Sequence, residues 1–317
     1  MATATAMPEA SRLLAEKIKR GFTVETPDDM TEEYRQALIQ TLIITGDTEF
    51  ASVPALLSAY RTAPTLNRKI TMLAIMQDEL GHAHIAYLLL RDLGVDVDLL
   101  LYERSPQEWK HPYAFDFELS NFVEIGLFNA LYDRAGYTLL SDVGQNTSYG
   151  PWRRALVKVD KEEMFHLRNG ESILREAVRH PDQREQLERA LLRMFIMGLE
   201  FFGVADAQKS RTKQLDFRLK GKTNDELRQE WLSKVVPFFD AIGVAVPAHF
   251  DETEQRWVLD FPFPCKFDEE RREWLLDQPD TWENVVKRFK SRGPRNREFI
   301  ERLQRGYRQY EALRQAE

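Results

Sequence analysis

Cysteine is almost missing from this sequence. Cys265 is the single cysteine among 317 residues, so the chain can form no internal disulfide. A cysteine-held iron–sulfur cluster and a zinc–thiolate site each need several thiolates, and both are excluded for the same reason. A chain of this length without disulfides is typical of the reducing cytosol.

Long apolar runs are also missing. No uncharged apolar stretch approaches the roughly 20 residues that span a bilayer. The N-terminus has neither the basic start nor the continuous apolar core of a signal peptide. We therefore expect no export signal, no membrane contact and a cytoplasmic location. The net charge of −7 gives no broad basic surface, so nucleic acid is not an expected partner.

Strand patterns are nearly absent between Thr31 and about Gln208. Apolar residues recur there three and four positions apart, as amphipathic helices require. Prolines and loop residues divide the segment into helices near 30–57, 66–94, 116–142, 150–178 and 183–210. The pattern predicts an all-α protein, with a helical bundle over 1–212.

The last third of the chain has a different character. We expect a further helix over 225–243, a short strand or two within 244–264, and short charged helices after 268. The predicted fold is therefore a four-helix bundle with additional helices, and with a mixed C-terminal extension over 213–317 packed on it.

Two Glu-x-x-His motifs occur in the helical region, Glu79 with His82 and Glu163 with His166. Residues three apart on a helix project from nearly one face, so each pair can present a carboxylate and an imidazole to one metal ion. One such motif arises easily by chance, but two in successive helical hairpins are far less ordinary. A carboxylate dimetal bundle also needs one acid from each of two other helices.

Those two acids occur at matching distances. Glu49 precedes Glu79 by 30 residues, and Asp133 precedes Glu163 by the same 30 residues. This internal repeat is typical of two similar hairpins related by a pseudo-twofold axis, with the metals between them. The pattern indicates that Glu49 and Asp133 complete the ligand set.

Two other acids compete with Asp133 for the third helix. Glu124 lies nine residues earlier, about 900° of helical rotation, and so points to the opposite face. Glu118 is the remaining competitor. The neighbours of Asp133 make a face of small residues, as expected beside ions and a cavity: Gly126, Asn129, Ala130 and Gly136.

The candidate ligands have apolar neighbours on their helices, which predicts that they lie in the core. Buried carboxylates are unfavourable unless they are paired, hydrogen-bonded or bound to a cation. The six are Glu49, Glu79, His82, Asp133, Glu163 and His166, of which the four acids are also the candidate catalytic residues. Four carboxylates and two imidazoles suit Fe(II) or Mn(II) better than structural zinc. We expect two iron ions, with manganese or a mixed pair as the alternative.

Several stretches are also similar to a known family. They are Ala63-Pro64-Thr65-Leu66, Gln77-Asp78-Glu79 with Gly81-His82, Ser148-Tyr149-Gly150-Pro151, Lys161-Glu162-Glu163 with Phe165-His166, and Thr223-Asn224-Asp225-Glu226-Leu227-Arg228-Gln229. Through them the chain resembles the catalytic A subunits of ring-1,2-phenylacetyl-CoA epoxidases, bacterial multicomponent diiron monooxygenases with a ferritin-like fold. The resemblance implies that the same six residues are iron ligands.

The resemblance further implies an acyl-CoA substrate such as phenylacetyl-CoA. Its phosphates would be met by Lys110, Lys220 and Lys222, with Asn224 nearby. Considered without the resemblance, these lysines are ordinary solvated surface charges.

Two positions depart from the family pattern. A lysine is expected four residues before the first motif glutamate, and an arginine nine residues before the first ligand, but this chain has Ile75 and Gln40. Loss of two cations near the site changes its electrostatics and its reach toward an acyl-CoA. The chain is thus expected to be this enzyme or a paralogue that acts on another acyl-CoA or aromatic substrate.

The expected reaction inserts one oxygen atom of O2 into an aromatic ring, as an epoxidation. The chain has no Gly-x-Gly-x-x-Gly after a strand and no cysteine cluster, so a separate reductase is needed to supply electrons. The resemblance adds a structural partner subunit in a hetero-oligomer. One alternative is a ferritin-like ferroxidase or metal-storage protein, although such chains usually lack this C-terminal extension. The other is a non-catalytic scaffold subunit, although such subunits tend to lose ligands.

Overall fold

A computed structural model describes residues 7–209, 213–291 and 294–316. The chain divides into two compact units, which we call the larger unit (Met1–Leu38 with Asn121–Val285) and the smaller unit (Ile39–Ser120 with Val286–Glu317). The predicted domain boundary between residues 212 and 213 falls beside residues outside the described ranges and stays a prediction. None of the helices in these ranges is long and apolar enough to cross a membrane.

The smaller unit is built on a helical hairpin. Its elements, including α2, which begins in the larger unit, are α2 (Glu32–Thr62), α3 (Leu66–Asp92), α4 (Val97–Tyr102), η2 (Pro106–Glu108), η3 (Tyr113–Asp116) and α12 (Pro294–Ala316). Helix α2 continues through Pro54 to Thr62, beyond the predicted end at 57, and stops just before Pro64. Thr65 then caps α3, because its hydroxyl accepts the backbone N–H of Arg68 at 3.2 Å.

Helix α12 completes the smaller unit, packing against α4, η2 and η3. The rings of Tyr102 and Tyr307 stack with their centroids 3.7 Å apart. The buried side chain of Asn296 donates to the carbonyl of Phe115 at 2.9 Å, fixing the start of the helix. At 23 residues, α12 is longer than the short charged helices predicted for this end of the chain.

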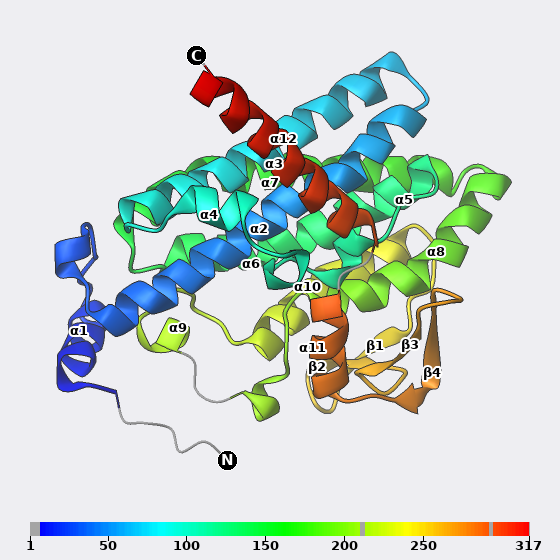
Figure 1. The fold of residues 1–317 in the computed structure, drawn as a ribbon. Helices are drawn as coiled ribbons and strands as arrows, with labels where there is room; N and C mark the ends of the chain where they lie inside the picture. The colour runs from blue at the N-terminus through cyan, green and yellow to red at the C-terminus, as the bar shows by residue number, and fades with distance from the viewer. Residues whose placement is uncertain (1–6, 210–212, 292–293, 317) are drawn as a thin grey trace. The chain divides into compact units, whose positions relative to one another are not determined.

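The larger unit holds most of the remaining helices, traced by colour in Figure 1. They are α1 (Glu9–Lys19), η1 (Pro27–Asp29), α5 (Phe122–Leu127), η4 (Phe128–Asp133), α6 (Arg134–Asn146), α7 (Gly150–Ala177), α8 (Pro181–Glu200), η5 (Asp206–Gln208), α9 (Lys213–Asp216), α10 (Asn224–Ala241) and α11 (Trp282–Ser291), the last of which ends in the smaller unit. Elements α5, η4 and α6 follow without a break, and η4 is a π-helix.

Trp231 ties α10 into the core of the larger unit. Its indole N–H donates to the carbonyl of Leu131 at 2.9 Å, and its ring packs 5.5 Å from that of Phe195. Gly198 on α8 makes this contact possible, because a Cβ there would lie 2.7 Å from the indole. The predicted fifth helix therefore packs here as α8, although it ends at Glu200 rather than near 210.

The C-terminal part of the larger unit is mixed, as predicted. Strands β1 (Ala248–Asp251) and β2 (Arg256–Leu259) pair antiparallel, and so do β3 (Cys265–Asp268) and β4 (Glu273–Pro279). The second hairpin lies where charged helices were expected, so that prediction was wrong; Phe267 opposite Trp274 gives it an aromatic cross-strand pair. The helical remainder confirms the predicted all-α, ferritin-like class, and the long segments expected for its bundle are all present.

Candidate metal centre

Three of the predicted ligands meet in the smaller unit. Glu49 projects from α2, and Glu79 and His82 project from α3; we call them the first triad. All three are buried, and one ligand atom of each lies within 4.8 Å of the others. Glu49 Oε2 lies 3.6 Å from His82 Nδ1. Helical spacing brings Glu79 and His82 to one face of α3, and Glu49 reaches them from α2.

A serine links the two acidic residues of this triad. The buried hydroxyl of Ser52 lies 2.6 Å from the carbonyl oxygen of Glu49 and 3.0 Å from Glu79 Oε2. Its single proton serves both oxygens, so it links the backbone of one ligand to the side chain of the next. The rotamer of Glu79 is therefore restrained before any ion binds.

A buried ionic network braces the hairpin beside the first triad. Asp47, two residues before Glu49, is fully buried and accepts two bonds from the Arg104 guanidinium at 2.9 and 2.7 Å. It also accepts the Tyr87 hydroxyl at 2.9 Å and the backbone N–H of Lys110 at 2.8 Å. Burial, together with the charge of Asp47, raises the pKa of Tyr87, which keeps this phenol a donor.

The other three predicted ligands lie in the larger unit, and we call them the second triad. Asp133 is the last residue of η4, while Glu163 and His166 project from α7, and all three are buried. Ligand atoms of Asp133 and His166 lie within 4.8 Å of each other. Gly136 faces Glu163: a Cβ at that position would lie 3.5 Å from Glu163 Oε2. The predicted face of small residues therefore borders this triad.

Amide side chains brace the second triad. Asn129 donates to Asp133 Oδ2 at 2.6 Å, and its own oxygen accepts from the Asn169 amide at 3.0 Å. Gly170 lets α7 approach closely, since a Cβ there would lie 2.4 Å from the backbone nitrogen of Ala130. The π-helical turn thus packs directly on α7. Such turns occur frequently at functional sites.

The acids that competed with Asp133 lie elsewhere. Glu124 is buried on α5 and forms an ion pair with Arg193 at 3.1 Å. Glu118 is exposed and precedes α5. Of the three candidates, Asp133 is the one that lies beside a motif histidine.

The donor chemistry of both triads fits a metal ion. Each combines two carboxylates with one imidazole in a buried setting, where uncompensated negative charge is strongly unfavourable. Hard oxygen donors with imidazole suit divalent first-row ions. The buried Glu/His clusters are therefore compatible with metal binding.

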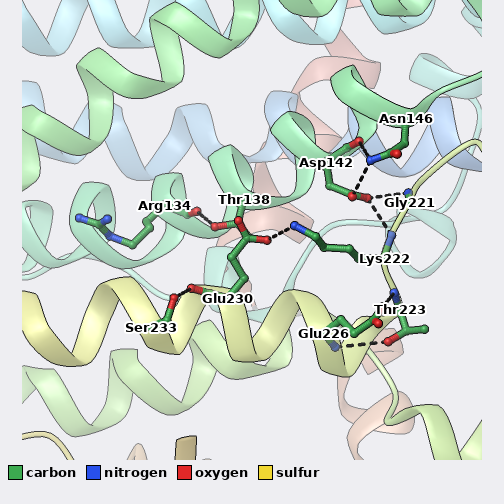
Figure 2. A network of polar contacts seen from close by, with 10 residues as sticks. All are labelled: Arg134, Thr138, Asp142, Asn146, Gly221, Lys222, Thr223, Glu226, Glu230 and Ser233. Atoms are coloured by element: carbon green, nitrogen blue, oxygen red, sulfur yellow. Dashed lines mark hydrogen bonds and ion pairs between the residues drawn. The ribbon is translucent and has the colours of Figure 1, made fainter. Parts of the chain in front are cut away.

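The predicted phosphate-binding residues fall into two places. Lys220 and Lys222 lie in the loop that precedes α10, where Figure 2 labels Lys222, and Asn224 is the first residue of that helix, whereas Lys110 is exposed in the smaller unit. Lys220 donates to Asn224 Oδ1 at 2.8 Å, and the Asn224 amide donates to the carbonyl of Val204 at 2.8 Å. Burial, with Lys209 nearby, lowers the pKa of Lys220 to about 8.

The two departures from the family pattern have different surroundings. Ile75 is fully buried on α3, one turn before Glu79, whereas Gln40 is exposed. An apolar side chain therefore occupies the buried position where a lysine was expected. Sequence reasoning placed Asn129 on the face beside Asp133 but did not predict its hydrogen bond to that acid, and it did not single out Asp47. An isolated asparagine or aspartate in a helix gives no signal of its partner.

The helical fold and the two carboxylate–histidine triads define a ferritin-like protein with the ligand types of a dimetal carboxylate site. The chain belongs to the phenylacetic acid catabolic protein family, whose sequence profile matches residues 5–312. It is 31% identical over 242 residues to the A subunit of the 1,2-phenylacetyl-CoA epoxidase of Escherichia coli strain K12. That alignment covers 74% of this chain and 78% of the relative. The resemblance seen in the sequence motifs is thereby confirmed.

Proposed function

We propose that this chain is the catalytic subunit of a diiron monooxygenase that inserts one oxygen atom of O2 into the aromatic ring of an acyl-CoA, such as phenylacetyl-CoA. The observation that carries the proposal is the burial of all six predicted ligands, three from each Glu-x-x-His hairpin. Ligand atoms of the first triad lie within 4.8 Å of one another, and those of Asp133 and His166 do too. The similarity to one component of an epoxidase supports the reaction type.

The proposed dimetal centre uses all six predicted ligands. A triad alone offers two acids and one histidine, whereas a dimetal carboxylate bundle uses four acids and two histidines. The 30-residue spacing shared by the two hairpins supports their pairing across a pseudo-twofold axis. Iron is the proposed metal because this donor set suits it. Bound iron would provide the oxygen chemistry, that is, the activation of dioxygen.

The protein's own residues hold and orient the reactants in this proposal. Ser52 and Asn129 fix the carboxylates of Glu79 and Asp133, so that little reorganisation accompanies the reaction. Lys110, Lys220 and Lys222 with Asn224 are proposed to bind the phosphates of the acyl-CoA. The buried Ile75 favours an apolar acyl group near the first triad.

We also propose that the chain works in a hetero-oligomer with a separate reductase. The relative is one subunit of its enzyme. On α3 five exposed apolar residues follow one another at steps of four, three, seven and eight residues and so share one face of the helix: Leu66, Ile70, Leu73, Leu80 and Leu88. Leu66 is 72% exposed and Ile70 is 56% exposed. Exposed apolar side chains gathered on one face of a helix support a protein–protein contact there.

The test begins with metal content. The purified chain is loaded anaerobically with Fe(II), unbound metal is removed, and iron and manganese are measured. We expect about two ions per chain, as in dimetal carboxylate bundles. Glu79→Ala and Glu163→Ala should each lose metal, while Glu188→Ala, an exposed acid paired with Arg184 on α8, should retain it.

Oxygen chemistry is tested next. The loaded chain is combined with reductase, phenylacetyl-CoA and the partner subunit under 18O2, and label in the acyl-CoA product is measured. If the wild-type chain binds no metal, the oxygenase proposal is rejected and a structural subunit is the better account. Oxidation of Fe(II) with no labelled product would instead support a ferroxidase.

A further inference from the structure

Asp142 anchors the loop that precedes α10. Its buried carboxylate accepts the backbone N–H groups of Gly221 at 2.8 Å and Lys222 at 3.2 Å through Oδ2. Oδ1 accepts the side chain of Asn146 at 3.0 Å (Figure 2). Two backbone donors on one carboxylate make a charge-assisted clamp. The backbone of the loop is thus fixed independently of its lysine side chains.

Gly221 fits this clamp closely. A Cβ at Gly221 would lie 2.3 Å from the amide nitrogen of Asn146, the same side chain that supports Asp142. Asp142 belongs to α6, which continues directly from η4 and its final residue Asp133. The clamp therefore connects the lysine loop to the helical segment that carries a candidate metal ligand.

The Lys222 ammonium is already bound to an internal carboxylate. Its Nζ donates to Glu230 Oε2 at 2.6 Å. The two side chains keep 43% and 38% of their surface exposed, and both line a cavity of ≈1100 Å³. A dissolved anion can therefore reach the pair, and an exposed ion pair of this kind is weak.

We propose that Glu230 is a built-in competitor for Lys222, which only a more strongly charged anion displaces, while Asp142 holds the loop in place during the exchange. A phosphate monoester carries about −1.5 to −2 charges near pH 7, against one for the carboxylate. The arrangement favours ligands with a terminal phosphate and disfavours monoanionic acids. This inference rests on the proposed acyl-CoA substrate and names a specificity-determining residue within that site.

The test measures binding of adenosine 3′,5′-bisphosphate, the nucleotide end of coenzyme A, to the metal-loaded chain by calorimetry. Glu230→Gln should tighten binding ~3- to 5-fold, the range that removal of a weak competing ion pair allows. Lys222→Met should weaken binding, and Glu230→Gln should have no effect in the Lys222→Met background. Glu188→Gln is the matched control on α8 and should bind as wild type.

The outcomes distinguish failure of the competitor role of Glu230 from failure of the phosphate site itself. If Lys222→Met weakens binding but Glu230→Gln leaves it unchanged or weaker, the competitor role is rejected and the phosphate site stands. If wild type does not bind the nucleotide and Lys222→Met changes nothing, the proposed acyl-CoA site fails, and the competitor role with it.

The anchoring role of Asp142 has its own readout. Asp142→Asn and Gly221→Ala should both weaken nucleotide binding while metal content stays at the wild-type value. A thermal melt checks that each variant is folded. A folded Asp142→Asn protein with wild-type affinity would overturn the anchoring role.

Discussion

The first triad is braced by buried charge, and the second by amides and close backbone packing. Beside Glu49, the Asp47 carboxylate binds Arg104 and Tyr87. Beside Asp133, neutral Asn129 forms the contact, and Gly170 brings the backbones together. The hairpins repeat the ligand pattern but not the support. Similar candidate metal ligands can thus be held in place by different kinds of interaction.

The backbone beneath the acids differs in the same way. Glu49 lies within the regular helix α2, whereas Asp133, one methylene shorter, ends the π-helical turn η4. A π-turn shifts the backbone relative to a regular helix. We infer that in the second hairpin a backbone displacement takes the place of side-chain length.

Removal of the ionic network around Asp47 should cause the largest loss in the free energy of unfolding. Asp47→Ala leaves the largely buried guanidinium of Arg104 without its carboxylate, and breaking a buried pair from one side costs about 3–5 kcal/mol. The free energy of unfolding, measured in urea, should fall by that amount. Tyr87→Phe removes one hydrogen bond to the same acid and should cost only about 1 kcal/mol. Equal losses in the two variants would contradict a brace based on charge.

Crowding the second hairpin should cause the next largest loss of stability. Gly170→Ala places a Cβ against the backbone nitrogen of Ala130, which cannot yield as a flexible side chain would. Overpacking of this kind costs about 1–3 kcal/mol, and we expect the upper end. Gly144→Ala on α6 is the control, because its Cβ would make an ordinary 3.5 Å contact with Leu156. A Gly170→Ala protein as stable as wild type would mean that the helices separate easily here.

Much of the fold followed from periodicity. The predicted ends of the helices now seen as α3 and α7 lie within two residues of the observed ends, because Pro64 and Pro151 mark where they start. The third helix was expected from 116 but begins at Phe122, where the Asn121 side chain caps it. Hairpin β3–β4 was missed, since its charged residues mask the aromatic pair.

The site could be predicted only in part, for a physical reason. Ligand candidates repeat at fixed spacings, so helical geometry alone brings Glu79 and His82 to one face. The partners of Asn129 and the π-turn at Asp133 depend on contacts between helices, which no local pattern encodes. The role of all six residues as iron ligands stays a prediction until metal is measured.

Removing the amide support tests the second triad directly. Asn129→Ala deprives Asp133 of its 2.6 Å donor and Asn169 of its acceptor. Loss of a residue that orients a ligand typically weakens metal affinity about 10–100-fold. Chelator competition with Fe(II) measures this loss. Ser52→Ala in the first triad is the paired variant, and a smaller effect there would show that the amide bond matters more than the hydroxyl.

The smallest expected effect is a gain in stability rather than a loss. Gly81 lies between Glu79 and His82 in the middle of α3, and apart from its chain neighbours and the backbone of its own helix no described atom lies within 4 Å of where its Cβ would be. Gly81→Ala should therefore stabilise the protein by about 0.5–1 kcal/mol, because alanine loses less backbone entropy in a helix. Urea unfolding and metal content together check this, with metal content expected unchanged. The same substitution at Gly170 should be destabilising. We therefore expect α3 to tolerate an added methyl group at Gly81 and α7 not to tolerate one at Gly170. A loss of stability at Gly81 would mean that the two hairpins are packed alike, and the contrast between them would fail.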